Sequence, residues 1–222
     1  MGVKLILTGA TGLVGEGVLL ECLQHPQVES VLIVNRKPYK GVPNAKLKEV
    51  IVADFFKLEN VSDQLKGYDA CLYCAGVSSN GVNEADYTRI TVDIPLHFAN
   101  VLLDLNPGMI FSHVSGSHTD GSEKGKIMWA RVKGKVENAL MKLPFKNVYN
   151  FRPGFMKPTA GQQNIKGYYK VINWLSPLLK LVFPGQLSTM REVGLAMINS
   201  VLRGYAKQVL EVVDIKALAK SA

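Results

Sequence analysis

A glycine-spaced turn near the start of the chain constrains the fold more than any other feature. Gly9, Gly12 and Gly15 follow an apolar run at residues 3–7 and precede a segment with helical patterning. The first glycine lets the chain leave a strand tightly, the second lets the backbone approach a phosphate, and the third lets the helix pack against the strand. The helix N-terminus offers unpaired N–H groups to the same phosphate. This context predicts a nucleotide site, formed here by Gly9, Thr11, Gly12, Leu13, Val14 and Gly15.

Length and composition predict one domain. The chain has 222 residues, of which 47% are hydrophobic, which suffices for one α/β domain but not for two. We therefore expect a single domain over residues 1–222. Lys4 interrupts the first apolar run, so a secretory leader is not predicted, and the expected location is the cytoplasm.

The cysteines are expected to be reduced and structural. Cys71 and Cys74 have Cys-x-x-Cys spacing, but they fall in a strand-like run, and residues three apart on a strand point to opposite faces. We therefore predict neither a redox site nor a metal site.

Short apolar segments alternate with helical ones along most of the chain. This order predicts an α/β fold of the Rossmann type, with a doubly wound parallel sheet covered on both faces. The tail should add a helix at 190–202 and an edge strand at 209–213. Strands are expected at 31–34, 47–52, 70–74, 109–114 and 147–151, and helices at 16–23, 83–105 and 126–143.

The alternation of strand-like and helical segments ends after residue 152, where prolines and glycines precede an apolar segment at 168–183. This segment is too short for a membrane span and contains a proline and two lysines. A lid over a substrate, a dimer surface and an interfacial membrane helix all fit it. We take residues 155–187 as a small C-terminal substrate cap, because ligands of such folds lie near the carboxyl ends of the strands.

The net charge of +8 is placed unevenly, with −3 on residues 1–110 and +11 on residues 111–222. The basic half could serve an anionic substrate, cofactor phosphates or an acidic surface, or could simply be solvated. We expect a small-molecule substrate and no nucleic-acid partner. A peripheral membrane contact, and the choice between monomer and homodimer, stay open.

The end of the second predicted strand indicates which dinucleotide is preferred. An acid that would hold the ribose 2′-hydroxyl of NAD is missing there, and Arg36 and Lys37 follow instead. A guanidinium at this place can bind the 2′-phosphate of NADP, so NADP(H) is expected over NAD(H). Asp54, just past the third strand, can accept from the adenine amino group or cap the following helix.

These motifs, together with Ala53-Asp54-Phe55, Cys74-Ala75-Gly76, Ser115, Lys133 and Arg152-Pro153-Gly154, resemble the atypical short-chain dehydrogenase/reductases. The resemblance covers nearly the whole chain and is greatest to the epimerase-like, NmrA-like and Tat-interacting oxidoreductase-like members. It implies catalytic positions at Ser115 and Lys133, and it implies that Lys133 also binds the nicotinamide ribose. It further implies cofactor contacts from Asp54, Phe55, Ala75, Gly76 and Pro153.

The chain departs from the family pattern at its proton donor. In that family a tyrosine four residues before the lysine protonates the substrate carbonyl, and here that position holds Trp129. An indole N–H is a donor only and cannot supply and recover a proton. The substitute donors that the sequence offers are Ser115, Ser117, His118 and Tyr87.

Three functions follow from these features. The first is an NADP(H)-dependent oxidoreductase that transfers hydride to a small carbonyl or quinone-like substrate. The second is a non-catalytic NADP(H)-binding sensor or regulator, which the tryptophan favours. The third is an assembly factor at a membrane surface.

Overall fold

The computed structural model describes residues 2–41, 43–164 and 186–221, and a parallel sheet of order β3-β2-β1-β4-β5-β6-β9 forms its centre. The chain moves outward in one direction from β1 to β3, and then in the other from β4 onward. This reversal places a crevice at the carboxyl ends of β1 and β4. The predicted doubly wound Rossmann-type fold is confirmed. The strands are β1 (Val3–Thr8), β2 (Val28–Asn35), β3 (Leu47–Ile51), β4 (Ala70–Tyr73), β5 (Ile110–Val114), β6 (Asn147–Phe151) and β9 (Val209–Leu210).

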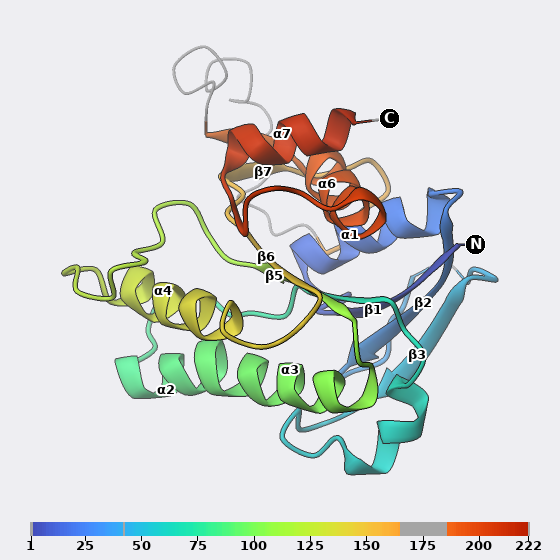
Figure 1. Cartoon of the computed structure of the whole chain (residues 1–222), viewed down its shortest axis with the longest axis horizontal. Helices are drawn as coiled ribbons and strands as arrows, with labels where there is room; N and C mark the ends of the chain where they lie inside the picture. Colours follow the sequence, from blue (N-terminus) through green and yellow to red (C-terminus); the bar gives the residue numbers. More distant parts are fainter. Residues whose placement is uncertain (1, 42, 165–185, 222) are drawn as a thin grey trace.

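Helices cover both faces of the sheet (Figure 1). One face carries α1 (Leu13–Gln24), α6 (Met190–Arg203) and α7 (Val212–Lys220). The other carries α2 (Glu84–Thr88), α3 (Ile94–Leu105) and α4 (Met128–Leu140). A short 3-10 helix, η1 (Glu59–Leu65), follows β3. In the described part of the chain no helix is both long and apolar enough to cross a membrane.

Two hydrophobic cores result, one on each face of the sheet. Cys71 belongs to the core beneath α3 and α4, whereas Cys74 packs against the core beneath α1 and α6. Both thiols, like Cys22, are free. The opposite placement of Cys71 and Cys74 agrees with the prediction from their spacing.

The helix predicted at 83–105 contains a π-helical turn. Asn83 caps its start by accepting a hydrogen bond from the N–H of Asp86, at 2.9 Å. After α2, the segment η2 (Arg89–Asp93) widens into π geometry before α3 begins. Such turns are rare and are often found at functional sites. This one lies beside the cleft described below.

The tail corrects one prediction. Only Val209–Leu210 is a strand within the predicted 209–213, and the unpredicted helix α7 begins at Val212. Glu211 and Asp214 form a capping box at its start, so the local hydrogen bonding favours a helix there. The strand does form the predicted edge of the sheet, beside β6.

A second, two-stranded parallel sheet pairs β7 (Phe155–Lys157) with β8 (Leu187–Thr189). It was not predicted, and it contains the two ends of the expected substrate cap. The apolar segment at 168–183, on which the lid, dimer and membrane alternatives rest, lies outside the described residues.

The loop after β7 is anchored to the first turn of α1. The two carboxylate oxygens of Glu16 accept hydrogen bonds from the backbone N–H groups of Gln163 and Asn164, each at 2.8 Å. The side-chain amide of Gln162 donates to the carbonyl of Leu13 at 2.7 Å. Glu16 is buried, and these bonds satisfy its carboxylate.

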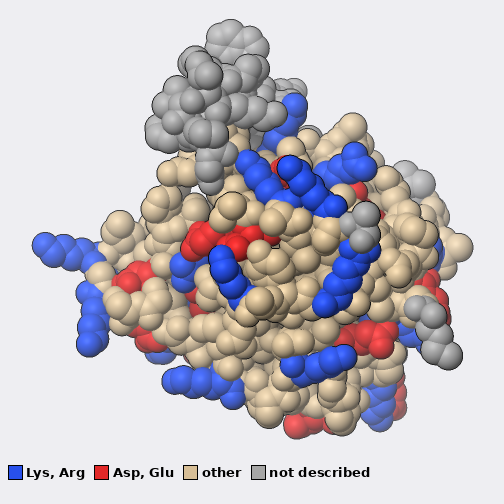
Figure 2. Space-filling view, turned by 45° about the horizontal axis from the view of Figure 1, so that its top comes forward, with Lys and Arg blue, Asp and Glu red and all other residues tan. Residues whose placement is uncertain are grey.

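The basic character of the second half does not appear as a single-sign patch on the face shown in Figure 2. Lys and Arg side chains are spread over this face, with Asp and Glu side chains among them. Several of the cations are paired, such as Lys207 with Asp214 at 2.7 Å and Arg152 with Glu211 at 3.0 Å.

Candidate functional site

A cleft of about 660 Å³ opens at the carboxyl ends of β1, β2 and β4, where the strand order reverses. The predicted residues Gly9, Thr11, Gly12, Arg36, Asp54, Phe55, Ala75 and Gly76 all line it. Lys37, Ala53 and Cys74, which belong to the motifs named in the sequence, line it as well. The lining residues that the sequence did not indicate are Val34, Asn35, Tyr73, Val77, Ile90 and Ile94.

The glycine turn forms one end of the cleft, and each glycine has a different reason to be there. Gly9 has φ +75°, and a Cβ on it would lie 2.7 Å from the N atom of Ala75. A Cβ on Gly15 would collide with the carbonyl oxygen of Gly9. A Cβ on Gly12 would meet only that same oxygen, at 3.4 Å. The fold therefore requires glycine at positions 9 and 15. At position 12 the fold would tolerate a side chain, and the absence of one leaves that space in the cleft open.

The N-terminus of α1 is open toward a ligand. Gly12 is the N-cap residue, and no side chain caps the helix there. The N–H groups of the first turn, which Leu13 and Val14 supply, are orphans of the kind that bind phosphate. Leu13, Val14 and Gly15 are not among the residues that line the cleft. A contact between this turn and a phosphate would therefore use their backbone N–H groups.

The floor of the cleft is fixed by Thr8, at the end of β1. Its buried hydroxyl accepts hydrogen bonds from the N–H groups of Cys74 and Ala75, both at 3.1 Å. The turn after β1 and the loop after β4 are therefore held together at the switch point. Burial raises the pKa of the Cys74 thiol to about 12, which keeps it protonated.

The end of β2 presents one buried amide and two exposed cations. Arg36 and Lys37 are exposed at the rim of the cleft. Asn35 is buried, and its amide Nδ2 donates to Glu49 Oε1 on β3 at 3.0 Å. Its Oδ1 is buried without a hydrogen-bond partner among the described residues.

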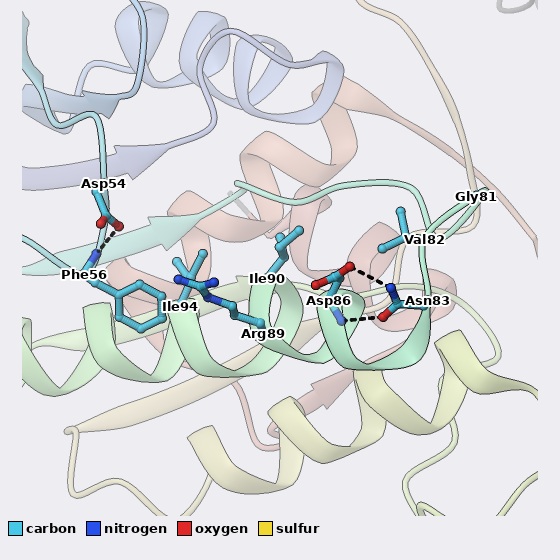
Figure 3. Close-up of a pocket in the computed structure, with 9 residues that line it drawn as sticks. All are labelled: Asp54, Phe56, Gly81, Val82, Asn83, Asp86, Arg89, Ile90 and Ile94. Atoms are coloured by element: carbon cyan, nitrogen blue, oxygen red, sulfur yellow. Dashed lines mark hydrogen bonds between the residues drawn. The ribbon is translucent and has the colours of Figure 1, made fainter.

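The far end of the cleft is suited to a flat apolar ring. Ile90 of the π-helical turn and Ile94 of α3 form one wall, with Asp54 at the edge. One Asp54 oxygen accepts from the N–H of Phe56 at 3.0 Å (Figure 3). The ring of Phe55 packs on Phe98, with 5.3 Å between the ring centroids, and thus belongs mainly to the core.

A shallower hollow of about 460 Å³ continues the cleft beyond Asp54, Ile90 and Ile94 (Figure 3). The guanidinium of Arg89 lies over the ring of Phe56, 5.6 Å from its centroid. The helix start at Asn83 closes the opposite side.

Ser115 follows β5 and lies in a hydroxyl chain. Its Oγ is 3.1 Å from Thr119 Oγ1, whose own proton goes to the carbonyl oxygen of Gly116 at 2.7 Å. Because Thr119 has a single hydroxyl proton, Ser115 is the donor in their shared bond. Ser115 then has lone pairs for a further hydrogen bond but no second proton.

Lys133 lies against the same turn. Its Cδ and Cε would be 3.7 Å from a Cβ on Gly116. Burial lowers the pKa of its ammonium group, and Glu137 one turn later opposes that shift. Trp129 lies one turn earlier on α4, half-buried, and packs against the core beneath α3 and α4.

Ser115, Trp129 and Lys133 are not among the residues that line the 660 Å³ cleft. The same holds for Pro153, which is buried just after β6. Among the substitute proton donors, Tyr87 is buried in the core, and burial raises its pKa. Ser117 is half-buried, and His118 is exposed with φ +64°. No cluster of three or more metal-ligating side chains occurs within residues 2–41, 43–164 and 186–221.

The missed lining residues had weak sequence signals. Ile90 and Ile94 are spaced one helical turn apart, which predicts a shared face but not that this face borders a cleft. Tyr73 lies near the end of a predicted strand, where ligand contacts are expected in this fold class. Asn35 directly precedes Arg36, and an uncharged amide at the end of a strand carries no specific signal for a ligand.

Relatives of the chain include fungal proteins. It is 31% identical over 143 residues to leucinostatins biosynthesis cluster protein T of Purpureocillium lilacinum, covering 63% of this chain and about half, 51%, of that protein. It is 25% identical over 163 residues to the mitochondrial protein fmp52 of Emericella nidulans, and the match covers 71% of this chain and 67% of that protein.

Solved structures share the fold at low identity. The Bordetella bronchiseptica enzyme WbmG, solved with NAD and UDP, superposes with a TM-score of 0.69 at 15% identity, over 99% of this chain and 78% of that one. The Helicobacter pylori ADP-L-glycero-D-manno-heptose-6-epimerase superposes with a TM-score of 0.66 at 14% identity, over 99% of this chain and 82% of that one.

A family model provides the assignment. The model described as NAD dependent epimerase/dehydratase family matches residues 5–132. That range runs from β1 through α4 as far as Val132 and includes the whole nucleotide cleft. The chain belongs to the NAD dependent epimerase/dehydratase family.

Proposed function

We propose that the protein is an NADP(H)-dependent oxidoreductase acting on a small carbonyl or quinone-like compound. The observation that carries the proposal is the pair of exposed cations, Arg36 and Lys37, at the β2 rim of the cleft. In this fold that rim faces the 2′ position of the adenosine ribose, and an arginine there suits a phosphate.

The cleft fits such a dinucleotide in three ways. The uncapped start of α1 supplies N–H groups for the pyrophosphate. Gly12 leaves open space above the turn. Ile90, Ile94 and Asp54 offer an apolar wall and an acceptor for the adenine.

The cofactor, when bound, supplies the hydride. In this proposal Lys133 holds the nicotinamide ribose, and the lone pairs of Ser115 orient a hydroxyl-bearing substrate or product. To donate to a carbonyl oxygen, Ser115 must turn its hydroxyl proton away from Thr119. The hydrogen bond between the two hydroxyls then persists only if Thr119 becomes its donor and gives up its bond to the Gly116 carbonyl.

A fluorescence titration with NADPH and NADH tests the cofactor. Arg36→Ala should weaken NADPH binding roughly 10- to 100-fold, as expected for a lost charge-assisted hydrogen bond, while NADH changes by less than about 3-fold. Arg203→Ala, at the far end of α6, is the matched control. Failure of the wild type to bind either dinucleotide would refute the proposal. An equal loss for both dinucleotides in Arg36→Ala would refute the NADP preference.

A non-catalytic NADP(H) sensor is the second candidate, and Trp129 favours it. Only a donor N–H is available where the family has its proton-exchanging tyrosine. Tight NADPH binding without NADPH consumption over a broad panel of aldehydes, ketones and quinones would support the sensor. Consumption with any of them would support the enzyme.

A further inference from the structure

We infer that Thr119 fixes Ser115 as a hydrogen-bond acceptor, so that the substrate site binds a compound bearing a hydroxyl group in preference to the matching carbonyl compound. The inference rests on the proposed function, in which Ser115 contacts the substrate. It deepens that function by naming the chemical form of the substrate that binds more tightly and the residue that determines this preference.

The turn after β5 holds Ser115 and Thr119 close together through its backbone. The N–H of Ser115 donates to the carbonyl of Phe151 on β6 at 2.8 Å, and the N–H of Thr119 donates to the carbonyl of Gly116 at 3.3 Å. The two hydroxyl oxygens lie 3.1 Å apart. Because the anchoring bonds use only backbone groups, they remain available when either hydroxyl is removed.

The direction of the hydrogen bond between the two hydroxyls follows from a third group. Thr119 Oγ1 lies 2.7 Å from the carbonyl oxygen of Gly116. A carbonyl can only accept, so the single hydroxyl proton of Thr119 is used in that bond. The contact between Ser115 Oγ and Thr119 Oγ1 therefore takes the proton of Ser115.

Burial holds this arrangement of protons in place. The exposed fraction is 7% for Ser115 and 6% for Thr119. A buried hydroxyl that turns away from its acceptor loses a hydrogen bond that water does not readily replace. The bond from Thr119 to the Gly116 carbonyl is also the shorter of the two, at 2.7 Å against 3.1 Å. Reversal of the chain would break that shorter bond.

The oxygen of Ser115 thus offers lone pairs to a ligand but no free proton. A ligand hydroxyl can donate to these lone pairs, whereas a carbonyl oxygen only accepts and would face a second acceptor. A carbonyl compound gains a bond from Ser115 only if the bond to Thr119 is broken. Thr119 is therefore a positioning residue that favours the hydroxyl form of the substrate at this atom.

Matched alcohols and ketones, such as benzhydrol with benzophenone and cyclohexanol with cyclohexanone, test the inference. Their dissociation constants are measured by calorimetry on protein loaded with NADPH for the alcohols and with NADP⁺ for the ketones, so that no turnover occurs. In Ser115→Ala the alcohols should bind roughly 3- to 10-fold more weakly, as expected for one lost hydrogen bond, while the ketones change by less than about 2-fold. An equal loss for the ketones would overturn the inference, because it would show that Ser115 donates to them.

Thr119→Val gives a second readout, which a merely structural role would not produce. The variant keeps the volume of the side chain and frees the proton of Ser115. The ketones should then bind roughly 3- to 10-fold more tightly, with little change for the alcohols, whereas a damaged turn would weaken both. Thr119→Ser keeps the hydroxyl and is the matched control, with the affinities of the wild type. Unchanged or weaker ketone binding in Thr119→Val would overturn the inference.

Failure of the proposed function has a different outcome. A wild type that binds neither NADPH nor NADH would refute that function. A wild type that binds NADPH would refute this inference alone if it bound none of the four compounds, or if Ser115→Ala affected alcohols and ketones equally.

Discussion

The hydroxyl of Thr8 accepts a hydrogen bond from the N–H of Ala75 at 3.1 Å and so joins the ends of β1 and β4 where the sheet changes direction. A second N–H, that of Cys74, shares the same acceptor. Thr8→Val keeps the shape and leaves both N–H groups without it. We expect a loss of about 1–3 kcal/mol in the free energy of unfolding and weaker NADPH binding. Urea unfolding measures the first effect, and Thr88→Val on α2 is the control. Wild-type stability of Thr8→Val would contradict the role.

Substitution of two glycines in the turn should separate folding from binding. Gly12 has φ −108°, which any residue can adopt, and a Cβ there has room. Gly12→Ala should therefore keep the thermal midpoint of the wild type and lose at least about 10-fold in NADPH affinity, because the methyl group occupies the path of the phosphate. Gly15→Ala should instead lower the midpoint, since its Cβ collides with the Gly9 carbonyl. Thermal unfolding and titration of both variants check this. The reverse pattern would show that the open space above Gly12 is not used.

Restoring the missing phenol should raise turnover. Trp129→Tyr places a hydroxyl one helical turn before Lys133, whose burial lowers its pKa. For any carbonyl that the wild type reduces slowly, we expect kcat to rise by on the order of 100-fold, as general acid help provides. Trp129→Phe removes the indole without adding a proton donor and should give no such rise. Equal rates for the Tyr and Phe variants would point to steric relief instead.

His113 should make the protein less stable in mild acid. Burial and the nearby charge of Lys133 lower its pKa from 6.5 to about 3, and a hydrogen bond to Asn150 opposes this shift. Between these values the unfolded chain binds a proton that the folded chain does not, so stability is full above about pH 6.5 and falls as the pH decreases. The slope approaches about 1.4 kcal/mol per pH unit. In urea unfolding over this range, His113→Gln should reduce the slope, whereas the exposed His118→Gln should not.

The cysteines should be inert in the folded protein although Cys74 lines the cleft. Burial raises the pKa of all three thiols, that of Cys74 to about 12. Because the thiolate is the nucleophile, a thiol reagent near pH 8 should react only after unfolding in guanidinium. Rapid modification of the native protein that disappears in Cys74→Ser would show that the cleft opens more widely than this structure indicates.

The sheet and the phosphate turn were predictable because their signals are local. Apolar runs of four to six residues mark the buried strands, and the spacing of Gly9, Gly12 and Gly15 follows from steric needs within the turn itself. The same holds for the opposite faces of Cys71 and Cys74, which depend only on strand geometry.

What the sequence could not show depends on contacts between distant segments. The bond between Asn35 and Glu49 requires the register of β2 against β3, in which Asn35 pairs with Ile51. The pairing of β7 with β8 joins two short segments whose paired residues are 32 positions apart in the sequence and which have little patterning of their own. The start of α7 was not predicted because residues 209–213 have the composition of a strand. The capping box formed by Glu211 and Asp214 instead starts a helix at Val212.

Among the described residues, the carboxylate of Glu16 holds the loop at 159–164 through two backbone N–H groups, those of Gln163 and Asn164. Every residue except proline carries such a group. The anchoring is therefore indifferent to which side chains the loop bears at these two positions, as long as its path is kept. Residues 163 and 164 can be exchanged to alter what the loop presents to its surroundings, while the first turn of α1 continues to hold it in place.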